Sequence, residues 1–302
     1  MRSAVLAMAY GTPERLEDVE AYYTHIRRGS PPSADQLSDL LRRYRAVGGP
    51  TELNRITRAQ AEGLSRALVA RGSAAPVYTG FKHVAPFVGD AVRRMGEDGI
   101  ERAVGIVLAP HYSLRSIAEY ERYAEEARPP GLDLEVVRAW YDDTGFVGFL
   151  AGRLRDALQR AGVSTLAVRS TEVVFTAHSV PASAIDRGDP YPEQLRESCE
   201  LVASRAGVGR WRLAYQSAGR TEEAWLGPDV LEVIDSIAEE GARGVVVQAI
   251  GFVADHLEIL YDLDVEARQR AESRGLAFTR VAMPNDDPAF VGVLADVVGP
   301  ML

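Results

Sequence analysis

The sequence is poor in cysteine and has no long apolar run. Its 302 residues contain one cysteine, Cys199. A single thiol cannot form an internal disulfide, a cysteine zinc site or an iron–sulfur cluster. The first apolar stretch, Ala4–Ala9, is far too short for a signal sequence or a membrane span. We therefore expect a soluble protein of a reducing, cytoplasmic compartment, with no iron–sulfur cluster and no integral membrane association.

Positive charge is also scarce. The chain has 34 basic and 43 acidic residues and a formal charge of −9, whereas nucleic-acid-binding proteins gather an excess of Lys and Arg. Nucleic acid is therefore not an expected partner. Lys82 is the one lysine among the bases, and its role, like that of the neighbouring His83, is left open by the sequence.

Short β-branched and apolar runs alternate with segments of helical period, the pattern of a mainly parallel α/β fold. Strands are expected at 4–9, 77–80, 104–109, 134–137, 173–177, 213–216, 245–250 and 277–281. Helices are expected at 87–98, 117–127, 145–161, 193–206, 230–240, 256–273 and 288–298. Four strands fall in each half of the chain.

The two halves repeat a short pattern. Ala9-Tyr10-Gly11-Thr12-Pro13 follows the first expected strand, and Ala177-His178-Ser179-Val180-Pro181 follows the fifth. The repetition predicts a duplication: two similar Rossmann-like domains, residues 1–142 and 143–302, each with a four-stranded parallel sheet flanked by helices. Ligands of open α/β sheets bind outside the carboxyl ends of the strands, so the active-site cleft is expected between the two domains.

The segment of about residues 20–55 is longer than one crossover helix needs, which favours an inserted lip over a ligand. Arginines there alternate with tyrosines. The arginines are Arg27, Arg28, Arg42, Arg43 and Arg45, and the tyrosines are Tyr22, Tyr23 and Tyr44. Arginine binds carboxylates or phosphates in a bidentate manner, and tyrosine offers a flat face to a planar ligand. A solvated basic helix explains the same composition equally well.

Two features suggest metal chemistry. His111, His178 and His256 follow expected strands, although a histidine in such a place is more often structural. At a helical period of 100° per residue, Glu258, Asp262 and Glu266 form an acidic stripe on an otherwise apolar helix. Their like charges repel, so a cation should compensate them. A thin solvent-facing edge is the alternative.

Other catalytic signatures are missing: there is no dinucleotide fingerprint, P-loop, nucleophile elbow or HExxH pair. The residues alone thus indicate a two-domain α/β protein whose cleft binds a metal and a flat or anionic ligand.

Several motifs, in order along nearly the whole chain, resemble the ferrochelatases, and most closely the short coproporphyrin ferrochelatases of monoderm bacteria. They are Met8-Ala9-Tyr10-Gly11-Thr12-Pro13, Tyr22-Tyr23-Thr24-His25-Ile26-Arg27-Arg28-Gly29, Leu108-Ala109-Pro110-His111, Thr176-Ala177-His178-Ser179, Gly188-Asp189-Pro190-Tyr191, Trp225-Leu226-Gly227-Pro228-Asp229 and Gly251-Phe252-Val253-Ala254-Asp255-His256-Leu257-Glu258.

The resemblance implies insertion of Fe²⁺ into coproporphyrin III to give coproheme, with iron as a substrate and no organic cofactor. It places His178 and Glu258 at the inner metal site, with Asp262 and Glu266 as a possible outer relay. Tyr10 would ligate the product iron from the opposite face. The implied porphyrin contacts are Tyr10, Arg27, Arg43, Tyr44, Thr51 and Tyr120.

Three alternatives stay open at this point: a protoporphyrin IX ferrochelatase, a sirohydrochlorin cobaltochelatase and a non-catalytic haem- or metal-binding protein. We also expect a monomer, and a downstream enzyme that handles coproheme as a possible partner. Which of His178 and Glu258 holds iron first, and which takes protons, the sequence leaves undecided.

Overall fold

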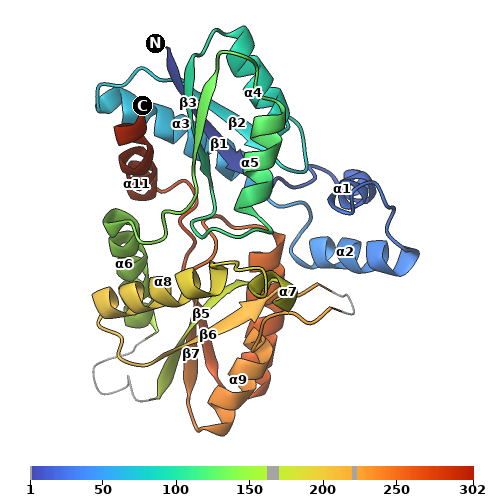
Figure 1. Ribbon diagram of the computed structural model, residues 1–302. Coiled ribbons are helices and arrows are strands. Elements are labelled where there is room, and N and C mark those ends of the chain that lie inside the picture. Colours follow the sequence, from blue (N-terminus) through green and yellow to red (C-terminus); the bar gives the residue numbers. More distant parts are fainter. Residues whose placement is uncertain (1, 162–169, 220–222) are drawn as a thin grey trace.

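The computed structural model describes residues 2–161, 170–219 and 223–302, and these form two four-stranded parallel sheets (Figure 1). The first sheet contains β1 (Ser3–Ala9), β2 (Val77–Phe81), β3 (Arg102–Val107) and β4 (Asp133–Val137). The second contains β5 (Thr171–His178), β6 (Trp211–Gln216), β7 (Gly244–Ala249) and β8 (Ala277–Arg280). The expected α/β class and the four parallel strands of each half are confirmed.

Both sheets have the same strand order, β2-β1-β3-β4 and β6-β5-β7-β8. β1 and β5 are therefore equivalent central strands, each paired on both sides. They are apolar on both faces because each face is covered: in β5, Phe175 packs into one core cluster and Val174 into another. The common order supports the duplication that the repeated pattern predicts.

The helices flank these sheets on both faces. The first half contributes α1 (Val19–Ile26), α2 (Ala34–Ala46), α3 (Leu53–Ala70), α4 (Val88–Glu97) and α5 (Ile117–Glu126). After them come α6 (Thr144–Arg160), α7 (Ala182–Ile185), α8 (Tyr191–Ala206), α9 (Val230–Glu239), the π-helix η3 (Ile259–Ala267), α10 (Arg268–Ser273) and α11 (Pro288–Val298). Apart from two short 3₁₀ turns in the described residues, Leu16–Asp18 and Gly299–Met301, the helices that the expected set lacks are α1, α2, α3 and α7. No described helix is long and apolar enough to cross a membrane.

The last long helix packs against the first half. α11 lies along α3, where the Cβ that Gly63 lacks would be 3.0 Å from Val291. Gln60 donates to the Asn285 carbonyl, and Arg71 binds Asp296. One core cluster therefore runs through both halves, from Leu64 to Phe290. A domain boundary at residue 142 stays a prediction.

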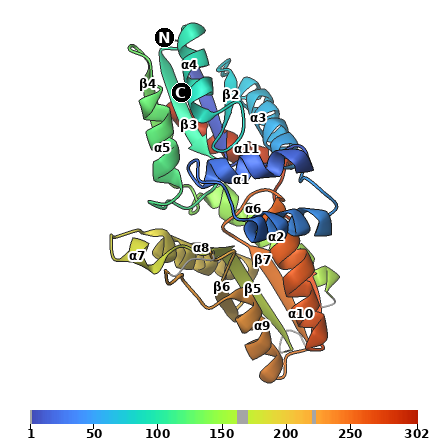
Figure 2. The same cartoon turned by 90° about the vertical axis from the view of Figure 1, so that its right-hand side faces the viewer.

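Helices α1 and α2 project from the side of the molecule near the level at which the two sheets meet (Figures 1 and 2). They occupy the range expected for a lip. α2 begins with a capping box in which Ser33 and Gln36 exchange hydrogen bonds, and its Tyr44 is 1% exposed. The cap and the buried tyrosine hold α2 as a defined helix.

The helix that carries the acidic stripe is not the regular α-helix expected for residues 256–273. Residues 259–267 form a π-helix, and only Arg268–Ser273 continue as α-helix. A π turn holds more residues than the 3.6 of an α-turn, so side chains four apart lie more nearly in line along the axis. Asp255, which the α period places beside the stripe, binds Arg280 and Asn285 instead.

Candidate active site

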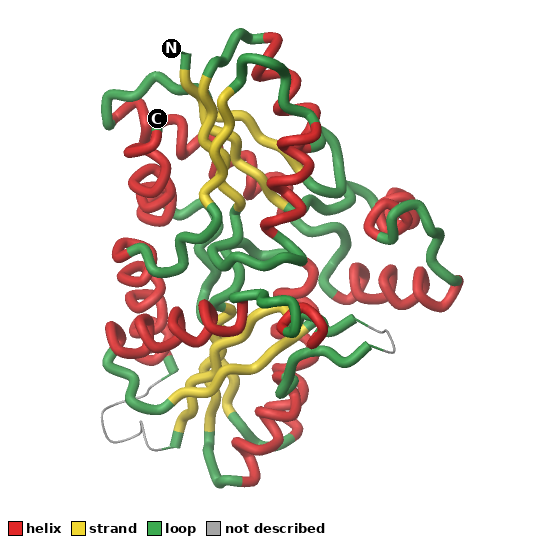
Figure 3. Tube along the Cα trace, viewed as in Figure 1, coloured by secondary structure: helices red, strands yellow, loops and turns green. Residues whose placement is uncertain are grey.

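The carboxyl ends of the strands in both sheets point toward the middle of the molecule, where connecting loops gather (Figure 3). His178 is the last residue of β5, and Tyr10 directly follows β1. The turn after Tyr10 needs Gly11, whose φ is +85° and where a Cβ would be 2.5 Å from Val84. Equivalent positions of the duplicated fold thus carry an imidazole in one half and a phenol in the other.

His178 and Glu258 form an ion pair, with 3.5 Å between Nε2 and Oε1. Their side chains are 37% and 39% exposed, so the pair faces open space. The Nδ1 of His178 hydrogen-bonds the Ser179 carbonyl oxygen. Because that carbonyl can only accept, Nδ1 carries a proton and Nε2 is directed toward Glu258. Nε2 is therefore the ring atom that faces Glu258, and it can accept a proton or hold a metal only in the neutral ring.

Each partner shifts the other's pKa. Burial alone would lower the pKa of His178, but the Glu258 carboxylate and the Ser179 carbonyl raise it to about 9. Burial alone would raise the pKa of Glu258, but protonated His178 lowers it to about 2. Near neutral pH the resting pair is therefore an imidazolium and a carboxylate.

The backbone of His178 is fixed by contacts that cross between the halves. Tyr191 donates its hydroxyl to the His178 carbonyl at 3.2 Å. The backbone N–H of Tyr191 donates to Asp189, which is 2% exposed. The same carboxylate accepts from the Ser113 hydroxyl at 2.7 Å and the Leu114 N–H at 2.9 Å. A buried aspartate of the second half thus binds the loop after β3 of the first half.

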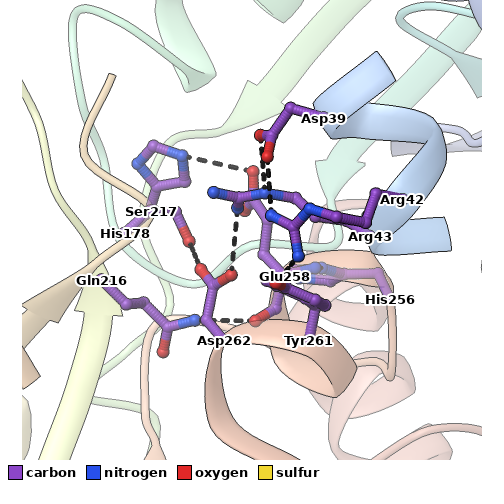
Figure 4. A network of polar contacts seen from close by, with 10 residues as sticks. All are labelled: Asp39, Arg42, Arg43, His178, Gln216, Ser217, His256, Glu258, Tyr261 and Asp262. Atoms are coloured by element: carbon purple, nitrogen blue, oxygen red, sulfur yellow. Dashed lines mark hydrogen bonds and ion pairs between the residues drawn. The ribbon is translucent and has the colours of Figure 1, made fainter. Parts of the chain in front are cut away.

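Asp262 lies one step further along the acidic stripe, with its side chain 8% exposed. It accepts a hydrogen bond from Ser217 and lies 3.4 Å from Arg43 of α2 (Figure 4). Burial and the charge of Glu258 raise the pKa of Asp262 to about 7, against the opposing effects of Ser217 and Arg43. Glu266 is half-buried, while the off-stripe Asp264 is held by Arg280.

Across from these acids, the first half presents aromatic and basic groups. The Nζ of Lys82 is 2.5 Å from Glu119, and it lies over the rings of Tyr10 and Tyr120 at 5.7 and 5.4 Å. The His83 ring packs against Tyr10 with 4.4 Å between centroids. Although Tyr10 is 42% exposed, burial of part of it and the charge of Glu258 both raise its pKa. Tyr10 of the first half therefore lies near enough to Glu258 of the second half to be affected by its charge.

The other residues implied as porphyrin contacts are placed differently from one another. Arg27 lies over the Tyr23 ring at 5.8 Å and donates to the Ser30 carbonyl. Tyr120 and Tyr44 are buried, with Tyr44 sharing a hydrogen bond with Thr12 at 3.1 Å. Thr51 donates to the same Thr12 hydroxyl at 3.4 Å. Tyr44 and Thr51 are thus joined through Thr12, while Arg43 is already paired with carboxylates.

The remaining candidate histidines have structural surroundings. His111 is 2% exposed, stacks on Tyr141 with 5.3 Å between ring centroids, and has a pKa lowered by burial to about 3. His256 accepts a hydrogen bond from the Glu258 backbone N–H, and burial lowers its pKa. His178 is the one of the three that faces a carboxylate of the stripe.

Sequence reasoning missed Ser217, Gln216 and the role of Asp189. Ser217 has a φ of +59°, an uncommon backbone conformation for serine, and its hydroxyl donates to Asp262. Gln216 donates to the Glu258 carbonyl at 3.1 Å. No local pattern marks the serine, but Asp189 lies in the quoted Gly188-Asp189-Pro190-Tyr191 motif and could have been singled out.

In the described residues, no three His, Cys, Asp or Glu side chains come close enough together to hold a metal ion. His178 and Glu258 could still offer two ligands to a metal that is passed on rather than kept. Cys199 is buried among apolar residues, and burial raises the pKa of its thiol. It lies in the core and not at this site.

Solved structures of chelatases share the fold. SirB from Bacillus subtilis with Fe³⁺ matches 99% of this chain and 95% of its own with a TM-score of 0.60 at 12% identity. CbiX, described as the terminal enzyme of sirohaem biosynthesis in denitrifying bacteria, matches 99% of both chains with a TM-score of 0.58 at 13% identity. The chain therefore has the chelatase fold.

The sequence comparisons narrow this class. The ferrochelatase family model matches residues 2–302. The coproporphyrin III ferrochelatase of Anoxybacillus flavithermus is 45% identical over 299 residues, covering 97% of this chain and 94% of that protein. That of Bacillus subtilis is 41% identical over 98% of this chain and 97% of its own length. A ferrochelatase of Thermus thermophilus is 44% identical over 97% and 98%. The chain belongs to the ferrochelatase family.

Proposed function

We propose that this protein inserts Fe²⁺ into coproporphyrin III and releases coproheme. The observation that carries the proposal is the His178 and Glu258 pair, exposed at the carboxyl end of the second sheet and electrostatically coupled to Tyr10 of the first. The names of relatives from Anoxybacillus flavithermus and Bacillus subtilis, at 45% and 41% identity, supply the tetrapyrrole.

The chemistry requires proton acceptors beside a metal path. A free-base porphyrin loses two pyrrole N–H protons while its four nitrogens bind the metal, and the ring must bend to expose them. The Glu258 carboxylate, and Nε2 of His178 once the imidazolium has released its proton, are placed to receive protons or to hold Fe²⁺ as its water leaves. Asp262 and Glu266 extend the carboxylates along η3 and are proposed as the outer relay.

The face opposite the acids suits a flat ring. Tyr10 is 42% exposed next to the buried Lys82 and His83, and it is proposed as the axial ligand of the product iron. Arg27, Arg43, Tyr44, Thr51 and Tyr120 are proposed to line or support the porphyrin. A planar tetrapyrrole between this face and His178 would be gripped in a bent form, so binding would favour the transition state.

Four carboxylates distinguish coproporphyrin III from protoporphyrin IX, which has two. Extra carboxylates need cationic or polar partners, and the lip supplies the half-buried Arg27 and the exposed Arg28. Arg28 is 78% exposed and pairs with Glu119. We propose that these arginines favour coproporphyrin. Protoporphyrin IX and, with cobalt, sirohydrochlorin are the alternative substrates, and a carrier without insertion activity is the alternative class.

The deciding experiment is anaerobic incubation of the protein with Fe²⁺ and either coproporphyrin III or protoporphyrin IX, followed by absorbance. We expect metalation of both to be detectable and the specificity constant for coproporphyrin III to be about tenfold higher or more, which corresponds to about 1.4 kcal/mol. Binding of porphyrin with no metalation would indicate a carrier. Preference for sirohydrochlorin with Co²⁺ would indicate a cobaltochelatase.

We further propose that the protein works as a cytoplasmic monomer and passes coproheme to a downstream enzyme that handles it. Sedimentation equilibrium of the protein tests the first point. Transfer of coproheme to a candidate acceptor, followed by difference absorbance, tests the second.

A further inference from the structure

The lip is attached to the helix that carries the acidic stripe. Arg42 of α2 donates to the Tyr261 hydroxyl at 2.5 Å. The guanidinium carbons of Arg42 and Arg43 lie 5.4 and 5.0 Å from the centre of the Tyr261 ring. The next residue of η3, Asp262, lies 3.4 Å from Arg43 (Figure 4). The inserted lip thus makes polar contacts with the proposed metal path itself.

Arg43 compensates the charge of Asp262. The Asp262 side chain is 8% exposed, and in the described parts of the chain it is bound by the Ser217 hydroxyl and by Arg43. Four residues before it, Glu258 has its cation in His178. A nearly buried carboxylate needs such a partner. The guanidinium of Arg43 therefore supplies at Asp262 the positive charge that a divalent cation would supply on the same path.

Arg43 has a second carboxylate within reach. Its Nε lies 3.2 Å from Asp39, one turn earlier on α2. If Arg43 left Asp262, it would keep the ion pair with Asp39, so its guanidinium would still have a carboxylate partner. The same guanidinium can therefore rest in two arrangements, with and without Asp262. Arg42 would keep α2 in contact with Tyr261 in both.

We propose that Arg43 couples the lip to metal delivery: a divalent cation that reaches Asp262 displaces Arg43 toward Asp39 and loosens α2 from η3. This rests on the proposed function, which makes Fe²⁺ the cation. Linkage is reciprocal. A substrate carboxylate that draws Arg43 toward the lip must strengthen metal binding at Asp262 by the same factor, so each substrate promotes the binding of the other.

The first test is calorimetric titration of Fe²⁺ into the porphyrin-free protein under anaerobic conditions. R43Q should bind Fe²⁺ about tenfold more tightly, since it removes a charge-assisted competitor for Asp262. R42Q is the matched control, because it loses the same charge from the neighbouring position, and Arg42 contacts Asp39 and Tyr261 but not Asp262. The gain in Fe²⁺ affinity should vanish in the double variant R43Q/D262N. Equal gains in R42Q and R43Q, or a gain that survives D262N, would overturn the coupling.

The second test is hydrogen exchange of α2 with and without Fe²⁺. Exchange in residues 34–46 should become faster with Fe²⁺ in the wild-type protein and should not respond to Fe²⁺ in R43Q. Exchange that ignores Fe²⁺ in the wild type would contradict the proposal. Neither test contains porphyrin, so the outcomes separate. If the protein inserts iron but Fe²⁺ does not speed the exchange of α2, only the coupling is wrong. If Fe²⁺ speeds the exchange of α2 but the protein does not insert iron, only the proposed function is wrong.

Discussion

The two halves use one scaffold for different chemistry. Each has the same strand order, and each ends its central strand at a ring, Tyr10 in the first half and His178 in the second. The strand beside β1 leads into Lys82, and the strand beside β5 ends at Gln216. Cations and aromatic faces gather at one edge, and carboxylates at the other. Duplication thus accounts for two facing edges that could specialise separately, and we propose that one serves the flat ligand and the other the ion.

The largest effect should come from the ring at the end of β5. His178→Ala is expected to reduce iron insertion by about a hundredfold or more, because it removes one of the two groups proposed to take protons or hold Fe²⁺. Porphyrin binding, followed by fluorescence quenching, should persist since other groups hold the ring. The matched change in the first half, Tyr10→Phe, should reduce insertion far less. If the two variants were equally impaired, the division of labour between the halves would be wrong.

Glu258→Gln should alter His178 itself. Without the carboxylate, burial dominates, and the pKa of His178 is expected to fall from about 9 to below its ordinary 6.5. The titration of the His178 ring by NMR measures this shift. An unchanged pKa would mean that the pair is not coupled.

The same pair makes stability depend on pH. His178 has a raised pKa, so its contribution is complete below 6.5 and is lost as the pH rises through about 9. Glu258 has a lowered pKa, so its contribution is present above 4.5 and is lost as the pH falls through about 2. Glu258→Gln should therefore lower the midpoint temperature of thermal unfolding most between pH 4.5 and 6.5, and this decrease should become smaller toward pH 9. Thermal melts across this pH range measure it.

On the lip, Arg27→Ala should raise the KM for coproporphyrin III about tenfold, since a charge-assisted contact is worth on the order of 1.5–3 kcal/mol. The KM for protoporphyrin IX should rise less, so the preference between the two porphyrins should shrink. Arg55→Ala, on the exposed side of α3 and paired with Glu52, serves as the surface control. A preference unchanged by Arg27→Ala would show that this arginine does not select the substrate.

Tyr191→Phe should lower kcat roughly threefold to tenfold, the worth of one hydrogen bond, with little change in the KM for porphyrin. Its hydroxyl holds the His178 carbonyl. Tyr141→Phe is the matched control, because Tyr141 also packs on His111 but directs its hydroxyl to the surface residue Glu197. An equal kcat in the two variants, whether lowered or unchanged, would argue against a positioning role for Tyr191.

The smallest effect is expected at the outer end of the stripe. Glu266→Ala should slow turnover about twofold at low Fe²⁺, because the charge acts at long range on a half-exposed path, and should have no effect at saturating Fe²⁺. Glu272→Ala, an exposed acid on α10, should have no effect at either concentration. A loss that persists at saturation would place Glu266 in the chemical step.

The strands were predictable to within about two residues because their apolar, β-branched runs are bounded by turns. The placement of His178 followed from the strand that precedes it, and that of Glu258 from the spacing of the stripe. The pairing of Arg43 with Asp262 was not predictable, since the two lie far apart in sequence and only tertiary packing joins them. The π-helix was not predictable either, because the period of the apolar residues does not distinguish i→i+5 hydrogen bonding from the i→i+4 bonding of an α-helix.

The packing of α11 on α3 also sets an order of events during synthesis. All strands of the first sheet are made by Val137, but the helix that covers Leu64 and Leu68 begins at Pro288. While the ribosome translates the residues between, that apolar surface has no α11 to bury it, and such transient exposure invites aggregation. The first half is thus made first and completed last, so a chain truncated before Pro288 should be captured by chaperones even though both sheets are present.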